Sequence, residues 1–295
     1  MPTVALVTAR AARGLDDDLS PLQAALQHAG ADIAVVDWDD TGVDWARFDL
    51  ALLRSTWGYT ERVAEFLAWA QRAGSQTRLL NPVDVVRWNT DKHYLGDLAG
   101  TGVATVPSEF IEPGANAATG LDDFLRRHAD GEFVVKPAIG AGSRDAQRYA
   151  RGQRDAALVH AQRLLDARRS VLLQPYLERV DEHGETALIY FGGTFSHAIR
   201  KGPLLKRGEG PTRALFAAEH ISARVPEAGE LRLAEQTLSA IPFAKPLTYA
   251  RVDLIHDAQH APCVLELELT EPSLFFAHAA GSAERFAKAI LARLA

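Results

Sequence analysis

The chain has 295 residues, 47% of them hydrophobic and 24% charged, so it is long enough for two or three compact units. The net charge of −6 argues against a broad basic surface for nucleic acid, and a single cysteine, Cys263, excludes an intrachain disulfide. The sequence shows no signal-peptide pattern and no apolar run near the ~20 residues that span a bilayer, so we expect a cytoplasmic protein with no nucleic-acid or membrane partner.

The first 90 residues alternate between strand-like and helix-like segments. Short apolar runs predict strands over 3–8, 31–37 and 49–53 and a strand with a turn over 79–82, while helical spacing predicts helices over 22–28 and 61–73. Ser20 is the expected N-cap of the first helix, with Pro21 at the first helical position, and Gly74 is expected to end the second helix. This order predicts an open α/β sheet.

The segment 54–59, RSTWGY, follows a predicted strand directly. Ligands of open α/β sheets bind at the carboxyl ends of strands, and this segment is dense in hydrogen-bond donors and aromatic rings. It is therefore either a ligand-contacting loop or an ordinary loop whose Trp57 packs on the core.

A strand near the middle of the chain ends in a lysine. The run 133–137, FVVKP, is apolar until Lys136, and a lysine at the end of a buried strand is costly unless it meets an anion. The loop Gly140-Ala141-Gly142-Ser143 follows, where successive backbone N–H groups can hold a phosphate. The loop is neither a Walker A motif nor G-x-G-x-x-G, since Asp145 takes the sixth position, and alone it would be read as a turn.

Two further segments offer groups for a nucleotide. Residues 174–178, QPYLE, close a predicted strand, where backbone groups could read an adenine edge and Glu178 or Glu185 could hold ribose hydroxyls; the alternative is a plain interdomain linker. A predicted hairpin over 185–201 ends in Arg200 and Lys201. These two cations either neutralise phosphate and a substrate carboxylate or belong to the surface.

Two acidic strands near the C-terminus are the most informative stretch. Residues 264–272, VLELELTEP, alternate with period two, so Glu266 and Glu268 share one face and the opposite face is apolar (Leu265, Leu267 and Leu269). Residues 249–255, YARVDLI, place Arg251 and Asp253 on one face, and the short connection suits antiparallel pairing. Carboxylates gathered in this way need a cation, and Mg²⁺ takes such oxygen ligands. The alternative is an amphipathic edge with a solvated face.

In this order the parts resemble the ATP-grasp superfamily. The match runs from near residue 85 to near 275 and consists of Lys92, Lys136 with its glycine loop, 174–177, 251–253 and 266–268. Within the superfamily the chain is most similar to glutathione-synthetase-like proteins. The segments 53–59, 135–143 and 265–275 resemble the cyclo-ligases of D-cycloserine biosynthesis.

The resemblance implies a mixed α/β (α+β) ATP-grasp fold. An open α/β pre-ATP-grasp domain on the substrate side would cover residues 1–90. Two α+β subdomains would clasp ATP, a central lid subdomain over 91–177 and a C-terminal subdomain with the metal site over 178–295.

The resemblance also implies a role for each matching residue. The expected ATP contacts, with Glu185 on the ribose, are Lys92, Lys136, Gly140, Gly142, Ser143, Gln174, Tyr176, Leu177 and Glu185. The expected Mg²⁺ ligands are Asp253, Glu266 and Glu268, although many relatives carry Asn at the last position. Three catalytic residues are expected: Arg251 would stabilise charge on the transferring phosphoryl group, and Arg200 and Lys201 would contact the substrate. Substrate would be recognised by Arg54, Ser55, Thr56 and Tyr59.

The activity implied is an ADP-forming, ATP- and Mg²⁺-dependent ligase that makes a C–N bond through an acyl phosphate. Two Mg²⁺ ions are expected, with Mn²⁺ as a substitute, and the substrate would be small and amino-acid-like, with a carboxylate and an amine; O-ureidoserine, cyclised to cycloserine, is one candidate. A homodimer is compatible with the sequence. The alternatives are an ATP-binding regulator without turnover and a small-molecule kinase. No H-E-x-x-H spacing occurs among the ten histidines, which argues against a zinc hydrolase.

Overall fold

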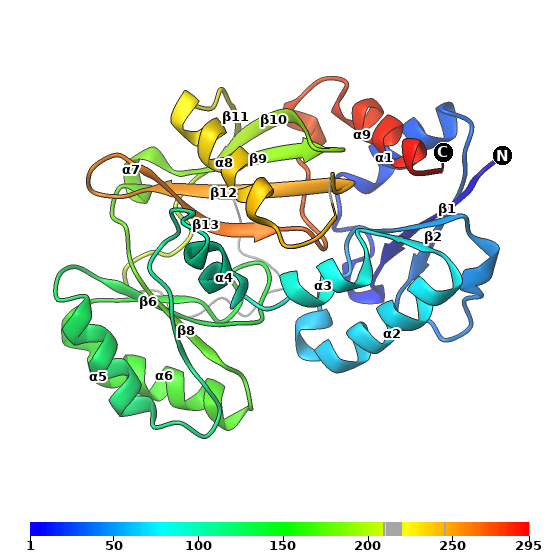
Figure 1. Cartoon of the computed structure of the whole chain (residues 1–295). Helices are drawn as coiled ribbons and strands as arrows, with labels where there is room; N and C mark the ends of the chain where they lie inside the picture. The colour runs from blue at the N-terminus through cyan, green and yellow to red at the C-terminus, as the bar shows by residue number, and fades with distance from the viewer. Residues whose placement is uncertain (209, 211–219, 245, 295) are drawn as a thin grey trace.

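The computed structural model describes residues 1–208, 210, 220–244 and 246–294. It contains three sheets, each covered by helices (Figure 1). Short 3₁₀ helices lie at Arg10–Ala12, Trp45–Arg47, Tyr59–Glu61, Arg151–Gln153, Phe276–His278 and Ala292–Leu294. No helix of the described residues is long and apolar enough to cross a membrane.

The N-terminal sheet is parallel and has the strand order β2-β1-β3-β4. Its strands are β1 (Thr3–Thr8), β2 (Asp32–Asp37), β3 (Leu50–Leu53) and β4 (Arg78–Leu80). The accompanying helices are α1 (Leu19–His28), α2 (Val63–Gln76) and α3 (Val83–Asn89). The strands of this α/β unit thus lie within one residue of their predicted starts.

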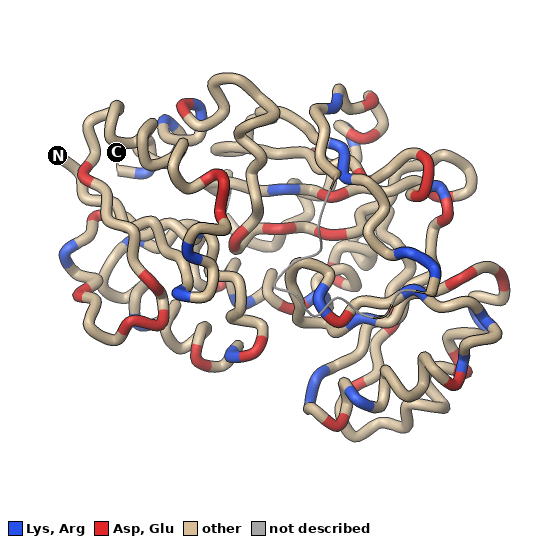
Figure 2. Tube along the Cα trace, turned by 180° about the vertical axis from the view of Figure 1, so that it is seen from behind, with Lys and Arg blue, Asp and Glu red and all other residues tan. Residues whose placement is uncertain are grey.

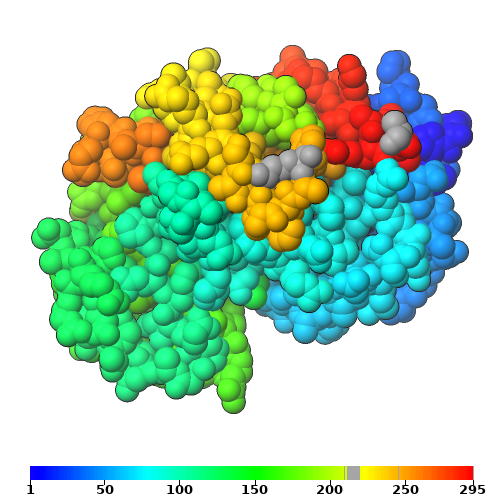
Figure 3. All heavy atoms as spheres, in the orientation of Figure 1, coloured from blue at the N-terminus to red at the C-terminus, as the bar shows by residue number. Residues whose placement is uncertain are grey.

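The central sheet is antiparallel, with the order β5-β8-β6-β7. Its strands are β5 (Glu109–Ile111), β6 (Phe133–Pro137), β7 (Gln147–Tyr149) and β8 (Val171–Pro175). Helices α5 (Ala117–Arg127) and α6 (Arg154–Asp166) cover one face and share a core with β6 and β8 (Figure 1). This unit and the N-terminal unit stand apart at the lower edge of the molecule in Figure 3.

The C-terminal sheet has the order β11-β10-β9-β12-β13 and is antiparallel throughout. Its strands are β9 (Glu185–Phe191), β10 (Thr194–Lys201), β11 (Ile221–Arg224), β12 (Tyr249–His256) and β13 (Pro262–Glu268). The helices that complete the chain are α4 (Tyr94–Gly100), α7 (Val180–His183), α8 (Ala228–Ala240) and α9 (Ser282–Leu291). Along the whole trace, basic and acidic residues are interspersed (Figure 2).

The two faces of the C-terminal sheet differ in what they contact. One face packs on α8 and on α4, through residues such as Leu254, Leu233 and Leu95. The other is apolar at one end, where Ile189 and Phe191 share a core with α9, α1 and β1. Its opposite end carries Glu185, Lys201, Arg251 and Asp253, which pair with one another. The sheet thus presents a charged end beside an apolar, tightly packed one.

Two buried asparagines join β13 and the segment after it to the N-terminal unit. Asn81 Nδ2 donates to the backbone oxygens of Tyr249 and Leu269, and its Oδ1 accepts from Thr248 N at 2.9 Å. Asn89 likewise donates to Leu267 O and accepts from the backbone N–H of Leu269. Among the described residues, β13 is the edge strand of its sheet, and these side chains hold the end of its free edge, beyond the single bridge between Thr105 and Val264.

Two local predictions for the N-terminal helices were wrong. The first helix begins at Leu19, with Asp18 rather than Ser20 at the N-cap position, and Asp18 instead accepts from three backbone N–H groups far along the chain (Leu274, Phe275 and Phe276). The second helix continues through Gly74 to Gln76. A Cβ at Gly74 would lie 2.6 Å from Val83 Cγ2, so this glycine serves helix packing and not helix termination.

Candidate active site

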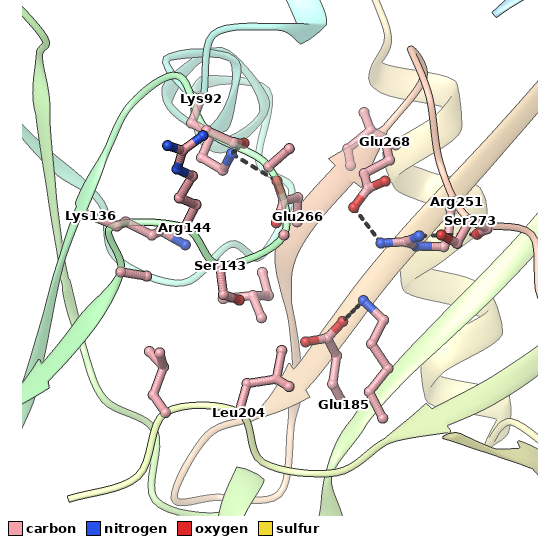
Figure 4. A pocket seen from close by; sticks show the side chains of 18 of the residues that line it. Lys92, Lys136, Ser143, Arg144, Glu185, Leu204, Arg251, Glu266, Glu268 and Ser273 are labelled. Atoms are coloured by element: carbon pink, nitrogen blue, oxygen red, sulfur yellow. Dashed lines mark hydrogen bonds and ion pairs between the residues drawn. The ribbon is translucent and has the colours of Figure 1, made fainter. Parts of the chain in front are cut away.

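A cavity of about 470 Å³ is lined by residues of the central sheet, of the C-terminal sheet and of the segments that connect the strands of the N-terminal unit. In Figure 4, Lys92, Lys136 and Ser143 lie on one side of it, Glu268, Arg251 and Glu185 lie on the other, and Glu266 lies between them. The lining also includes an apolar part (Val106, Val134, Val180, Leu204, Leu205, Ile255 and Leu265). The cavity therefore combines an apolar pocket with two opposed charged walls.

The first charged wall is formed by two lysines and the glycine loop. Lys92 Nζ donates to Gly140 O at 2.7 Å and lies 2.8 Å from Glu266 Oε1, so it ties the loop to the acidic strand. Burial opposes the charge of Lys92, but the nearby carboxylates raise its pKa above the usual value. Gly142 adopts a left-handed φ of 61°, which glycine tolerates without strain. The predicted loop and both predicted lysines thus come together.

Lys136 has no ion-pair partner in the described part of the chain. Burial lowers the pKa of its ammonium group to about 8, against weaker support from the Glu266 carboxylate. A buried ammonium without a partner carries a free-energy cost that a bound anion would remove. This is the geometry expected of a phosphate-binding lysine.

The second wall is the pair of acidic strands, in the predicted antiparallel arrangement. Asp253 lies opposite Glu266 and Arg251 lies opposite Glu268, and the register shifts after Asp253. Strict alternation predicted that Leu265 lies in the core with Leu267 and Leu269. Because of this bulge, Leu265 instead lies partly exposed at the cavity, outside the core that holds Leu267 and Leu269.

Each of the three predicted metal carboxylates has a cationic partner. Asp253 accepts from Lys201 Nζ at 2.7 Å and from Arg251 at 2.8 Å, and these cations outweigh burial and hold the pKa of its carboxyl far below its usual range. Arg251 also pairs with Glu268, whose pKa burial nevertheless raises to about 7. Burial of Glu266 is offset by Lys92 and Lys136, which lower its pKa.

The carboxylates of Glu266 and Glu268 line the cavity, whereas Asp253 lies behind Lys201 and Arg251. Among the described residues, the carboxylates of Asp253, Glu266 and Glu268 do not form a group whose ligand atoms all lie within 4.8 Å of one another. Their oxygens are nevertheless of the type that Mg²⁺ binds, and a divalent ion could replace the cationic side chains that now neutralise them.

The nucleotide end is formed by β8 and the residues after it. Gln174, Tyr176 and Leu177 line the cavity as predicted. The Tyr176 N–H donates to Glu132 O, and its ring stacks 3.5 Å below the guanidinium carbon of Arg148. Among the described residues, no backbone hydrogen bond uses the Tyr176 C=O or the Leu177 N–H. One acceptor and one donor therefore remain for the edge of a base.

The adjacent cations Arg200 and Lys201 point in opposite directions, which corrects the prediction that both serve the site. Lys201 lines the cavity and pairs with Glu185 and Asp253. Arg200 instead donates to the backbone oxygens of His183 and Glu182. Neighbouring residues of a strand face opposite sides, so only one of the two can reach the cavity. Glu185 also lines it, and burial raises the pKa of its carboxyl to about 8.

The predicted substrate segment divides in the same way. Tyr59 and Trp57 line the cavity, but Arg54, Ser55 and Thr56 are fully buried and lie outside its lining, so direct contact with substrate is revised for these three. Arg54 donates to Pro272 O at 3.2 Å and lies 3.6 Å from Asp16 and 3.8 Å from Asp18. Arg54 therefore contacts residues next to or in the cavity lining and does not itself reach the cavity.

Sequence reasoning missed several lining residues. Glu271 is the most important, because its carboxyl is buried beside Tyr59 and its backbone oxygen accepts from Trp57 Nε1 at 3.1 Å. Period-two alternation, continued past Glu268, puts Glu271 on the face opposite to Glu266 and Glu268, but β13 ends at Glu268. Others are Asp16, Asp17, Asp18, Arg144, Ser273 and His278. An acidic residue directly before a proline at a strand end was the available signal.

A second polar cluster lies away from the cavity. The ligand atoms of His183, Glu230 and His256 lie within 4.8 Å of one another. However, Arg224 donates to His183 Nε2 and lies 3.8 Å from Glu230 Oε1, so a fixed cation already neutralises the buried carboxylate. We interpret the cluster as an anchor for α7, the short helix that begins with the cavity-lining Val180.

Known proteins share this architecture and sequence. A family model described as the N-terminal domain of D-cycloserine synthetase DcsG matches residues 4–81. The cycloserine biosynthesis protein DcsG of Streptomyces lavendulae is 42% identical over 299 residues, which cover 100% of this chain and 99% of that protein. The chain belongs to the DcsG family.

Solved structures agree with this assignment. The crystal structure of D-cycloserine synthetase DcsG superposes with a TM-score of 0.93 at 41% identity, over 99% of this chain and 100% of that one. D-alanine–D-alanine ligase from Bacillus anthracis, solved in complex with ATP, gives a TM-score of 0.71 at 15% identity over 99% and 96% of the two chains, a likeness of fold alone. Membership of the DcsG family confirms the predicted ATP-grasp fold and the predicted class, an ATP-grasp ligase that forms C–N bonds.

Proposed function

We propose that the protein is an ADP-forming ligase that uses ATP and Mg²⁺ to join a carboxylate and an amine of a small amino-acid-like substrate through an acyl phosphate. The observation that carries the proposal is the pair of opposed walls in one cavity. Lys136, without an ion-pair partner among the described residues, and Lys92 with the glycine loop face Arg251, Glu266 and Glu268. Phosphoryl transfer needs positioning and charge neutralisation more than covalent catalysis, and these groups supply both.

ATP would lie across the cavity. Its adenine would enter the apolar end, where the Tyr176 C=O and the Leu177 N–H are available, and the triphosphate would meet Lys136, Lys92 and the loop from Gly140 to Ser143. The loop itself is held by Lys92, which donates to Gly140 O. A phosphate that took over Lys92 would loosen this bond and leave the loop free to move onto the phosphates.

The carboxylates of Glu266 and Glu268, with Asp253 behind them, would hold Mg²⁺, which when bound neutralises charge on the transferring phosphoryl group. Arg251 would then be released from Glu268 while Asp253 still orients it, at 2.8 Å. Its guanidinium would stabilise the oxyanion of a tetrahedral intermediate. Lys201 keeps Asp253 ionised and in place at 2.7 Å.

We infer the identity of the substrate from the related proteins. The full-length relative from Streptomyces lavendulae is a cycloserine biosynthesis protein, and the similar crystal structure is a D-cycloserine synthetase. We infer that this chain cyclises O-ureidoserine, an intramolecular reaction in which one molecule supplies both the carboxylate and the attacking nitrogen. A silent ATP-binding regulator is disfavoured because Arg251, Glu266 and Glu268 are all in place at the cavity, whereas a kinase would need the same residues and is distinguished by its product.

The test is to incubate the protein with ATP, Mg²⁺ and a panel of amino acids, dipeptides and O-ureidoserine, with and without hydroxylamine. Substrate-dependent ADP together with a C–N product, or a hydroxamate when hydroxylamine is present, is the expected result. A stable phosphorylated product would show a kinase. ATP binding without turnover on any substrate would show a regulator.

A further inference from the structure

The buried and partly buried carboxylates that line the cavity differ in their charge partners. Among the described residues, all but one have a cationic side chain as an ion-pair partner: Asp16 and Asp18 have Arg54, Glu185 has Lys201, Glu266 has Lys92, and Glu268 has Arg251. The exception is Glu271, whose side chain forms no ion pair in the described part of the chain although the residue is only 8% exposed.

The groups around Glu271 do not supply the missing charge. The Tyr59 hydroxyl interacts with its carboxyl, and Trp57 Nε1 donates to its backbone oxygen, so both aromatic residues hold it in position. Burial, followed by the negative charge of Glu268, raises the pKa of the Glu271 carboxyl to about 8. A buried carboxyl without a cationic partner is stabilised in its ionised form when a bound ligand brings a cation next to it.

The position of Glu271 indicates which ligand this is. It lies beyond the end of β13, at the wall formed with Trp57 and Tyr59 of the N-terminal unit, whereas the adenine end is formed by Gln174 to Leu177 on the opposite subdomain. A phosphate, which is itself an anion, would gain nothing from the Glu271 carboxyl. A compact organic cation is attracted by both the carboxylate and the aromatic faces beside it.

We propose that Glu271 binds the substrate's amino group as an ammonium ion, with Tyr59 orienting the carboxylate and Trp57 fixing the backbone. The proposal rests on the ligase function proposed above and deepens it, because it assigns the substrate class to compounds that carry a free primary amine. A carboxylate substrate without that amine would leave Glu271 buried and unpaired.

The experiment measures ligand binding and not turnover. Calorimetric titrations, in the presence of Mg²⁺ and a non-hydrolysable ATP analogue, compare O-ureidoserine with its des-amino analogue 3-(ureidooxy)propanoate, and alanine with propionate. We expect the wild type to prefer the amine form by at least about tenfold, and Glu271→Gln, which is isosteric and uncharged, to lose that preference. Tyr59→Phe, which keeps the ring, should lose part of it.

The matched control is Glu284→Gln, which removes an exposed carboxylate of α9 that is not part of the lining and should leave the preference unchanged. Wild-type discrimination retained in Glu271→Gln would overturn the proposal, as would failure of the wild type to bind either amine form. Loss of Mg²⁺ or ATP-analogue affinity with discrimination intact would also overturn it, by assigning Glu271 to the metal. Failure of the ligase function shows separately, as absence of ADP formation by the wild type.

Discussion

Replacing Lys136 by Met should stabilise the ligand-free protein and weaken its binding of ATP. The ammonium group of Lys136 is largely buried and has no ion-pair partner among the described residues, and burial lowers its pKa from 10.5 to about 8. In the folded state the protonated form is therefore penalised, and methionine removes this penalty while keeping most of the side-chain volume.

The size of the two effects follows from the same observation. A shift from 10.5 to about 8 corresponds to about 3 kcal/mol, which partial solvent access reduces to roughly 1–2 kcal/mol of added stability at pH 7. Because the unfolded chain holds its proton up to about pH 10, this gain should shrink between pH 8 and 10.5 and disappear above it. Loss of one charge-assisted hydrogen bond to a phosphate costs about 1.5–3 kcal/mol, or roughly 10- to 150-fold in affinity.

Urea unfolding of the ligand-free protein at pH 7 and pH 10.5 measures the first effect, and calorimetry with a non-hydrolysable ATP analogue measures the second. Lys288→Met is the control, since Lys288 is exposed on α9 and lies outside the cavity lining. ATP-analogue affinity equal to that of the wild type would refute the phosphate role of Lys136. A stability gain that persists unchanged at pH 10.5 would refute the electrostatic reasoning and leave only better packing.

Three further predictions test other parts of the site. Glu266→Gln should reduce Mg²⁺-dependent ADP release by roughly a hundredfold while the folded state persists by circular dichroism, and survival of the activity would mean that the acidic face is merely solvated. Arg200→Ala should leave kcat within about twofold because its side chain faces α7, whereas Lys201→Met should lower kcat by roughly tenfold or more; equal effects in steady-state assays would contradict the assigned orientations. Asn81→Ala should lower the free energy of unfolding by about 2–4 kcal/mol, since three buried hydrogen bonds are lost, and a change below about 1 kcal/mol would show that the joint between the units is held by other contacts.

The parts of the site that sequence could predict are those governed by local periodicity. Alternation along β12 and β13 correctly placed Arg251, Asp253, Glu266 and Glu268 on one patch, and the break at Lys136 marked a residue that faces the cavity. The same rule, applied to the adjacent pair at the end of β10, allows only one of Arg200 and Lys201 to face the site.

The remainder depends on contacts between distant segments. Nothing in the sequence around Asp18 indicates that its carboxylate binds the backbone N–H groups of residues 274–276, and nothing around Arg54 indicates that it lies beneath the site. The bulge after Asp253 similarly depends on how two strands meet. Glu271 has only a weak signal in the sequence, an acidic residue before a proline, and its place in the site depends on how the segment after β13 meets Trp57 and Tyr59.

The most direct test of the central claim is the coupling between ATP cleavage and bond formation with O-ureidoserine. ADP and product should be measured together over one time course, with wild type and Glu266→Gln side by side. The ligase function predicts ADP and a C–N product in equal amounts, both dependent on Mg²⁺ and both lost in the variant. ADP formation without any C–N product, or product formation without ATP, would contradict it.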